Sequence, residues 1–320
     1  MRHIDFRAMN CEMSVVLDTD NTAFDVLLQQ VPTWFEAWEQ TFSRFRSDSE
    51  LSQLNASTGQ WFKVSEDLWT VVDMAVRTAR THEGLITPTV LDALMSAGYD
   101  QSFDQMGQVT KPVRAVNRVG GISALDALAG IECDAQARTV FLPKGVRLDL
   151  GGFVKGWCAD EVVQRLAISL PQNTPALMDA GGDIAISGAM ADGGAWPIGI
   201  ADPFDAEHDL AQVMVKRCGV ATSGRDYRKW TQDGMARHHI IDPRAGNSAQ
   251  TDVLSASVIA TTAQQAELAS KMLLILGAQA GMAWINAQND YGVCVVLDDG
   301  EIRMNAQFEQ CVWKNTSVQP

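Results

Sequence analysis

Residues 146–160 read VRLDLGGFVKGWCAD, and the fold can be built outward from this stretch. An apolar run ends at Asp149, two glycines follow, and Lys155 opens a segment with helical apolar spacing that continues to Leu166. This pattern predicts a strand, a glycine turn and a helix. Glycine has no Cβ, so the N–H groups of the turn can approach a ligand closely, and the following helix N-terminus favours an anion. The stretch therefore predicts an anion pocket with a carboxylate beside it.

The length and charge of the chain limit its class. Its 320 residues suit one large domain or two closely packed ones. We expect a single unit over residues 1–320, with sub-lobes at about 1–145 and 146–320 as the alternative division. The formal net charge of −14 argues against non-specific binding to nucleic acids or anionic membranes, which requires a basic surface. No stretch is apolar for long enough to span a bilayer, so we expect neither a nucleic-acid partner nor membrane insertion.

The cysteines and the N-terminus bear on the compartment. The six cysteines are scattered and none forms a CxxC pair, which favours free thiols in a reducing compartment over a disulfide framework or a zinc site. The first residues carry charges and no continuous apolar stretch, and Cys11 lacks the apolar run that precedes a lipidated cysteine. We expect a cytoplasmic protein, although a chain from which a leader had been removed would read the same way.

Strand and helix patterns occur in blocks and do not alternate strictly. This arrangement predicts an α+β fold with mixed or antiparallel sheets. The polar, turn-rich segment 101–118 is expected to be a surface connection. The main helices are expected at about 23–42 with a break near Pro32, at 64–81, from 155 onward, and at 262–276; the main strands are expected at 13–17, 131–134, 139–142, 176–188, 253–260, 293–297 and 302–305.

Two polar constellations have both a structural and a functional interpretation. Arg44 and Arg46 flank Phe45, and they form either a clamp for an anionic aromatic ligand or a solvated face with one anchoring ring. His238 and His239 are adjacent on an extended segment, so their side chains point to opposite faces, and a shared zinc ion is not expected. The glycine pairs beside Asp149 and Asp183 match neither a dinucleotide fingerprint nor a phosphate loop, and each alone is more often a tight turn.

Six motifs occur in a characteristic order. They are FSRFRSDSEL (42–51), TPT (87–89), DLGGFVKG (149–156), GGDI (181–184), ATSG (221–224) and HIIDPRAG (239–246). In combination the chain resembles the FAD:protein FMN transferase family, the ApbE-type proteins, over about residues 6–277. The resemblance implies an α+β fold with FAD in a cleft. It also implies Mg²⁺-assisted cleavage of the FAD pyrophosphate, transfer of FMN to a threonine or serine of a target flavoprotein, and release of AMP.

The resemblance also assigns residues. It implies metal binding at Gly152, Glu267 and Ser270, and catalytic roles for Lys155, Glu267 and Lys271. The positions implied to contact FAD are Met9, Phe45, Ala97, Gly98, Tyr99, Asp149, Lys155 and Ile241.

The departures from the family pattern concentrate on the metal. Thr87 stands where the family usually has an aspartate, and Met9-Asn10-Cys11 replaces Met-Gly-Thr. On the C-terminal helix, Glu267, Ser270 and Lys271 stand where the family carries a metal-binding aspartate followed by an Asp-Thr or Asp-Ala pair.

An ammonium at Lys271 would repel Mg²⁺, which prefers carboxylate and carbonyl oxygens. Two readings follow. One is an FMN transferase with an altered metal site. The other is an FAD-binding protein without transferase activity, a flavin carrier, redox partner or regulator, in which Lys271 replaces the metal. The intact glycine motifs count against a third reading, a protein that keeps only the fold. We interpret the chain as a transferase because most of the framework is present.

Overall fold

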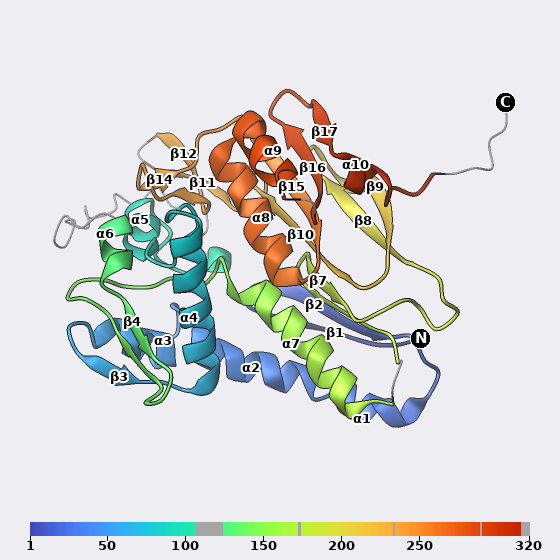
Figure 1. Ribbon diagram of the computed structural model, residues 1–320, viewed down its shortest axis with the longest axis horizontal. Coiled ribbons are helices and arrows are strands. Elements are labelled where there is room, and N and C mark those ends of the chain that lie inside the picture. The colour runs from blue at the N-terminus through green and yellow to red at the C-terminus, as the bar shows by residue number, and fades with distance from the viewer. Residues whose placement is uncertain (107–123, 172–173, 233, 289, 315–320) are drawn as a thin grey trace.

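The computed structural model describes residues 1–106, 124–171, 174–232, 234–288 and 290–314. Most of the predicted segment 101–118 therefore lies outside the described residues. Helices and the small sheets of the N-terminal part gather on the left in Figure 1, and the large sheet with its covering helices lies on the right. No helix among the described residues has the length and apolar character needed to cross a membrane.

An eight-stranded antiparallel sheet forms the centre, in the order β1-β2-β6-β7-β10-β15-β16-β17. The strands are β1 (Arg2–Ala8), β2 (Cys11–Leu17), β6 (Ala176–Ala180), β7 (Asp183–Ile186), β10 (Cys218–Gly224), β15 (Val253–Ala260), β16 (Gly292–Leu297) and β17 (Ile302–Met304). Because β2 pairs with β6, the sheet joins strands from both sides of residue 145. This pairing supports our proposal of one unit instead of two sub-lobes.

Both faces of the sheet are covered, which explains why its inner strands read as nearly continuous apolar runs. One face packs against α7 (Val154–Ser169) and α8 (Ala263–Leu276), and α9 (Ala278–Asn286) packs on α8. The opposite face packs against the ribbon of β8 (Trp196–Asp202) and β9 (Asp205–Val215), with Phe308 of α10 (Ala306–Glu309) in the same apolar cluster.

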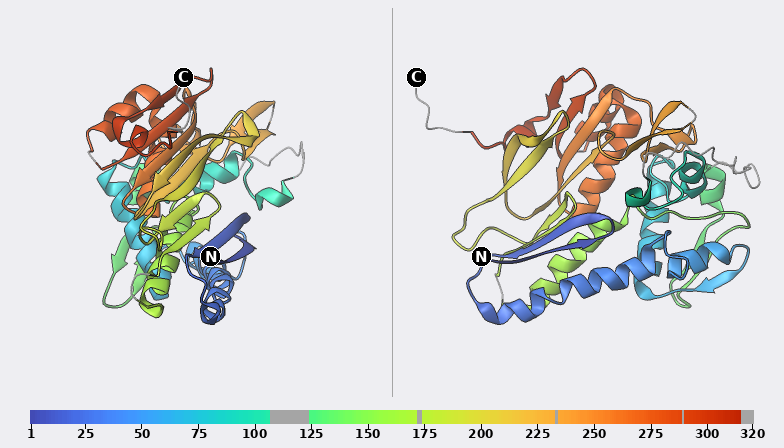
Figure 2. Two further views of the ribbon diagram at one scale, coloured as in Figure 1. Left: turned by 90° about the vertical axis from the view of Figure 1, so that its right-hand side faces the viewer. Right: turned by 180° about the vertical axis from the view of Figure 1, so that it is seen from behind.

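The N-terminal part supplies helices that wrap the end of the sheet. Seen from behind, the hairpin β1–β2 lies beside α2 (Figure 2). The strands β3, β5 and β4 form a three-stranded sheet, whose labelled strands β3 and β4 lie to the left of α4 in Figure 1. These elements are η1 (Thr22–Phe24), α1 (Asp25–Leu28), α2 (Val31–Phe42), α3 (Glu50–Ala56), β3 (Trp61–Lys63), α4 (Glu66–Thr81), α5 (Leu91–Ser96), η2 (Phe103–Gln105), α6 (Ala124–Ala129), β4 (Glu132–Asp134) and β5 (Thr139–Phe141).

The helix starts follow local capping chemistry. Ser49, Ser65 and Thr262 each accept a hydrogen bond from a backbone N–H in the first turn of α3, α4 and α8. Such caps satisfy N–H groups that have no partner within the helix. The predicted long helix breaks before α2, which has Pro32 in its first turn, where proline is tolerated.

One local prediction was wrong, and one strand was not predicted. The first residues form the edge strand β1, which the sequence analysis did not predict. Residues 146–150 are not a strand, although their apolar run suggested one. Their backbone is held by other partners: Asn55 bonds both the N–H and the C=O of Leu148, at 2.7 and 2.9 Å, and Asp149 N donates to Pro88 O at 2.8 Å. Because these backbone N–H and C=O groups form hydrogen bonds outside a β-sheet, residues 146–150 can be buried without pairing to a strand.

Two further ribbons lie beside the site. They are β11 (Lys229–Gln232) with β12 (Met235–His238), and β13 (Ile241–Asp242) with β14 (Asn247–Ser248). They continue the chain from the end of β10 and return it to β15. Their position brings the HIIDPRAG motif next to the glycine turn that precedes α7, as the cavity between them shows.

Candidate functional site

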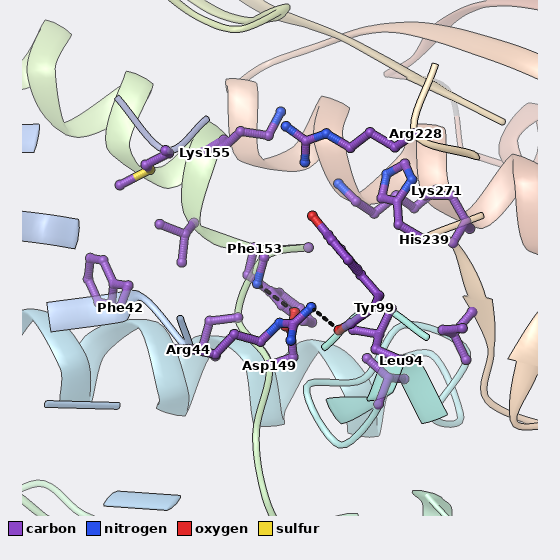
Figure 3. A pocket seen from close by; sticks show the side chains of 18 of the residues that line it. Phe42, Arg44, Leu94, Tyr99, Asp149, Phe153, Lys155, Arg228, His239 and Lys271 are labelled. Atoms are coloured by element: carbon purple, nitrogen blue, oxygen red, sulfur yellow. Dashed lines mark hydrogen bonds and ion pairs between the residues drawn. The ribbon is translucent and has the colours of Figure 1, made fainter. Parts of the chain in front are cut away.

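A cavity of about 470 Å³ lies between the N-terminal helices, the turn before α7, and α8. Figure 3 shows its side chains in two groups, with Arg44 and Asp149 on one side and Lys155, Arg228, His239 and Lys271 on the other. A second cavity of about 230 Å³ adjoins it. The two share the residues Gly151, Lys155, Arg228, His239 and Lys271. The shared residues include three cations, Lys155, Arg228 and Lys271, so the junction of the two cavities is suited to an anionic ligand.

The side of the cavity at Asp149 is built as a rigid wall. Arg44 Nε pairs with Asp149 Oδ2 at 2.6 Å, and Arg44 Nη2 donates to Tyr99 O at 2.8 Å. The guanidinium carbon also lies 4.0 Å from the ring centre of Phe45 and 4.6 Å from that of Tyr99. Asp149 in turn accepts a hydrogen bond from Gly151 N at 2.9 Å. This wall therefore presents aromatic rings to a ligand and keeps its own charges neutralised.

The arginines around Phe45 are therefore not an anion clamp. Arg44 is committed to Asp149, and Arg46 pairs with Glu36 and Glu39 at 2.5 and 2.8 Å. Of the two interpretations left open by the sequence, the clamp is wrong because carboxylates of the same chain already occupy both guanidinium groups. Phe45 itself lines the cavity.

The opposite side carries a cluster of buried charges. Lys155 pairs with Asp183, which is buried, at the start of β7. Lys271 Nζ pairs with Glu267 Oε1 at 2.9 Å, one turn earlier on α8. Glu267 Oε2 accepts a hydrogen bond from Gly156 N at 2.9 Å, which ties α8 to the first turn of α7. The cluster is therefore two ion pairs joined through the backbone of the glycine motif.

The ion pairs set the protonation of this cluster. Burial acts to lower the pKa of the Lys155 ammonium, but Asp183 and Glu267 outweigh it and the pKa lies above its usual range. Burial acts to raise the pKa of Glu267, but Lys271 and Lys155 outweigh it and hold the pKa below its usual value. Both groups are therefore charged at neutral pH.

His239 and Arg228 are site residues that sequence reasoning missed. His239 lines both cavities, and its Nδ1 is buried without a hydrogen-bond partner among the described residues. Burial, with Arg228 and Lys271 nearby, holds the pKa of His239 well below its usual value, so the imidazole is neutral. His238 points elsewhere and bonds Ala249 O at 2.8 Å through Nε2. The signal for His239 was present in the HIIDPRAG motif, but from the sequence this histidine was considered only as a zinc ligand beside His238.

Arg228 lies on the turn before β11 and reaches the junction of the two cavities (Figure 3). Its guanidinium donates to Cys11 Sγ at 3.1 Å and lies within ion-pair distance of no carboxylate in the described part of the chain. Its charge is therefore available to a ligand. No motif marked Arg228, because its position depends on the conformation of the turn between β10 and β11.

The predicted FAD contacts divide into two sets. Six of them line the larger cavity, namely Met9, Phe45, Tyr99, Asp149, Lys155 and Ile241. Ala97 and Gly98 are not among its lining residues. They pack against the β11–β12 ribbon instead: Ala97 O accepts a hydrogen bond from Trp230 Nε1 at 2.7 Å, and the space beside Gly98 is taken by Trp230 and Gln232. These two residues support Tyr99 but do not face the cavity.

The predicted metal-binding residues do not fit a magnesium ion. Glu267 and Ser270 are buried behind Lys271 and line neither cavity. Both carboxylate oxygens of Glu267 are engaged, and Ser270 Oγ is bonded to Ser223 Oγ at 2.7 Å. Among the residues that the structure describes, no group of three or more His, Cys, Asp or Glu side chains could hold a metal ion. Mg²⁺ requires near-octahedral oxygen ligands, and here an ammonium faces the carboxylate.

Known proteins resemble this chain over most of its length. A family model described as the ApbE family matches residues 9–296. A protein of Treponema pallidum named FAD:protein FMN transferase is 29% identical over 92% of this chain and 84% of its own. One of the same name from Vibrio cholerae is 30% identical over 88% and 81%. The crystal structure of an ApbE protein from Thermotoga maritima superposes with a TM-score of 0.84 at 24% identity, covering 98% of this chain and 99% of that one. The flavin transferase ApbE from Vibrio cholerae superposes with a TM-score of 0.79 at 23% identity, over 97% and 98%.

Proposed function

Because this chain belongs to the ApbE family, we propose that it is an FAD:protein FMN transferase, which moves FMN from FAD to a serine or threonine of a target flavoprotein and releases AMP. One observation carries the proposal. Lys155, Arg228 and Lys271 meet the neutral His239 where the two cavities join. Cations there suit a pyrophosphate, and a neutral base beside them suits attack by a hydroxyl group.

The two sides of the site take different parts of FAD. Met9, Phe45 and Ile241, which the resemblance assigns to the flavin, line the larger cavity and offer apolar and aromatic surface. The pyrophosphate lies at the junction, where Lys155 and Arg228 approach from α7 and from the β10–β11 turn. The N-terminal end of α7 adds partial positive charge, although Gly151 N and Gly156 N are already bonded to Asp149 and Glu267.

The transfer step is a phosphoryl transfer. The hydroxyl oxygen of the target residue attacks the phosphorus of the FMN half of FAD. A new oxygen–phosphorus bond forms, and the bond from that phosphorus to the bridging oxygen breaks, so that its electron pair leaves with AMP. The hydroxyl proton passes to the imidazole of His239, whose low pKa keeps it unprotonated before the step. Lys155 and Arg228 stabilise the charge that develops on the phosphate oxygens.

The relatives' names favour the transferase over a flavin carrier, redox partner or regulator, and we propose only the transferase. The scattered cysteines, which favour a reducing compartment, support the cytoplasm as the proposed location. No step of this mechanism uses Mg²⁺, because the residues around Glu267 do not fit the ion.

The test is the release of AMP from FAD by the purified protein, with a flavoprotein that carries threonyl-linked FMN, prepared without flavin, as acceptor. We expect AMP and an acceptor heavier by one FMN group. The His239→Asn variant is expected to bind FAD but to transfer about 10²- to 10⁴-fold more slowly, the usual range for loss of a general base. Binding of FAD with no AMP release, whether or not Mg²⁺ is added, would contradict the proposal.

A further inference from the structure

Lys271 lies beside the residues that the family resemblance assigns to a metal, Gly152, Glu267 and Ser270. Its ammonium lies 2.9 Å from Glu267 Oε1. Its Cε and Cδ lie 3.6 and 3.7 Å from where a Cβ on Gly152 would stand. Ser270 is its neighbour in the chain and is bonded to Ser223 and to the carbonyl of Glu267. A positive charge of the protein's own therefore sits where an ion would have to bind.

The pairing with Glu267 makes a divalent cation at this place unfavourable. Glu267 is fully buried, and its carboxylate balances Lys271 directly. A cation entering beside Glu267 would have to displace the ammonium and would be repelled by it at short range. Lys155 adds a second nearby charge of the same sign, because it also acts on Glu267. The cluster Lys155, Asp183, Glu267 and Lys271 is already neutral without a metal.

The same geometry leaves the ammonium accessible from the cavity. Lys271 lines both cavities, and its side chain is 13% exposed while that of Glu267 is 0% exposed. Figure 3 shows the end of Lys271 beside His239, with the hydroxyl of Tyr99 and the guanidinium of Arg228 nearby. A lysine ammonium has three N–H donors, so it can keep Glu267 and still donate to a phosphate oxygen.

We propose that Lys271 is a built-in replacement for the divalent cation, so that this chain binds the pyrophosphate of FAD without metal. A second part of this proposal rests on the proposed transferase function: FMN transfer by this chain also proceeds without metal. Lys271 contacts the pyrophosphate beside Lys155 and Arg228, Lys155 keeps its ion pair with Asp183, and Glu267 is the acceptor that holds Lys271 in place. Glu267 and Ser270 are thus positioning residues and not metal ligands.

The experiment measures FAD and riboflavin affinity of the full chain by isothermal titration calorimetry, first with EDTA and then with Mg²⁺. We expect the wild-type affinity for FAD to be the same in both conditions. Lys271→Met is expected to weaken FAD binding about 10- to 100-fold, as for loss of a hydrogen bond to a charged group. It should leave riboflavin binding unchanged, because riboflavin has no phosphate.

Two control variants separate charge from general damage. Phe45→Ala should weaken FAD and riboflavin alike, because it removes ring contact and no charge. Lys63→Met removes an exposed lysine on β3 that lines neither cavity, and it should change neither affinity. Lys271→Thr is the converse test: Glu267 loses its ammonium, and FAD binding should become stronger when Mg²⁺ is added.

The outcomes distinguish this inference from the proposed function. FAD binding by the wild type that requires Mg²⁺ would overturn the inference and leave the transferase proposal intact. Unchanged FAD affinity of folded Lys271→Met in EDTA would also overturn it. Absence of FAD binding in every condition would instead contradict the proposed function. The wild-type comparison needs no variant, so a misfolded Lys271→Met protein would not prevent the test.

Discussion

Two carboxylates on opposite sides of the cavity, Asp149 and Glu267, are each neutralised by a cation of the same chain, but the two cations are held differently. Arg44 is fixed by Asp149, by the carbonyl of Tyr99 and by two aromatic rings. Within the described residues Lys271 has one ion-pair partner, Glu267, and its flexible side chain ends at the cavity. The first pair is a part of the wall, whereas the second can share its cation with a ligand. A buried ion pair near a site therefore has to be judged by how many contacts hold its cation.

The largest expected effect is at Arg44. Arg44→Met leaves Asp149 with an uncompensated charge, and both side chains are nearly buried, at 7% and 11% exposure. We expect the free energy of unfolding to fall by about 3–5 kcal/mol. Urea denaturation measures it. Arg46→Met is the matched control, since its pairs are more exposed and its loss should cost about 1 kcal/mol or less. Equal losses for the two variants would mean that Arg44 is not a structural part of the wall.

A smaller effect is expected at Glu267. Glu267→Gln keeps an acceptor for Gly156 N but removes the partner charge of Lys271. We expect the free energy of unfolding to fall by about 1–3 kcal/mol. FAD affinity in EDTA should rise, because the freed ammonium no longer divides its charge between Glu267 and the pyrophosphate. Asp149→Asn is the contrasting variant. Because Arg44 remains held by the carbonyl of Tyr99 and by two aromatic rings, FAD affinity should not rise in this variant. A rise of FAD affinity in both variants would show that the Asp149 and Glu267 sides of the cavity do not differ in this way.

The smallest expected effect concerns His239, the neutral member of the Lys271 side. Its pKa in the folded protein is lowered by burial and by the nearby cations, so below about pH 6.5 only the unfolded chain takes up the proton. The contribution of the neutral His239 to the free energy of unfolding is therefore fully present above pH 6.5 and decreases as the pH falls below it. Because of this histidine, the free energy of unfolding should fall by about 1 kcal/mol between pH 6.5 and 5.5. His239→Asn should remove that part of the slope in urea denaturation at the two pH values, while His238 contributes equally to both proteins. Parallel slopes would show that His239 titrates normally.

The sequence predicted the α+β class and most helices because the signals were local. Blocks of apolar periodicity and capping residues such as Ser65 and Thr262 act within a few residues. β1 was missed because it is an edge strand with charged residues along its exposed face, and its alternation was taken for a polar N-terminus. The run 146–150 was misread because burial alone does not show whether a backbone has a strand partner.

The site was predictable only as far as its motifs extend. Asp149 and Lys155 followed from the glycine stretch, but their partners did not. Lys155 meets Asp183 across 28 residues, and Glu267 meets Gly156 N across 111. Arg228 carries no motif of its own, and the direction of His239 depends on the irregular segment after β12. Such contacts arise from tertiary folding, which local propensity does not encode.

The long separation between Gly156 and Glu267 has a consequence for synthesis on the ribosome. The glycine turn emerges early, but the acceptor that closes the first turn of α7 comes 111 residues later. Until α8 has emerged, the nascent chain has no complete pyrophosphate pocket, whatever part of the sheet has already formed. Any chain that stops before residue 267 lacks both Glu267 and Lys271. The competence to hold the nucleotide is thus acquired only after α8 has been synthesised.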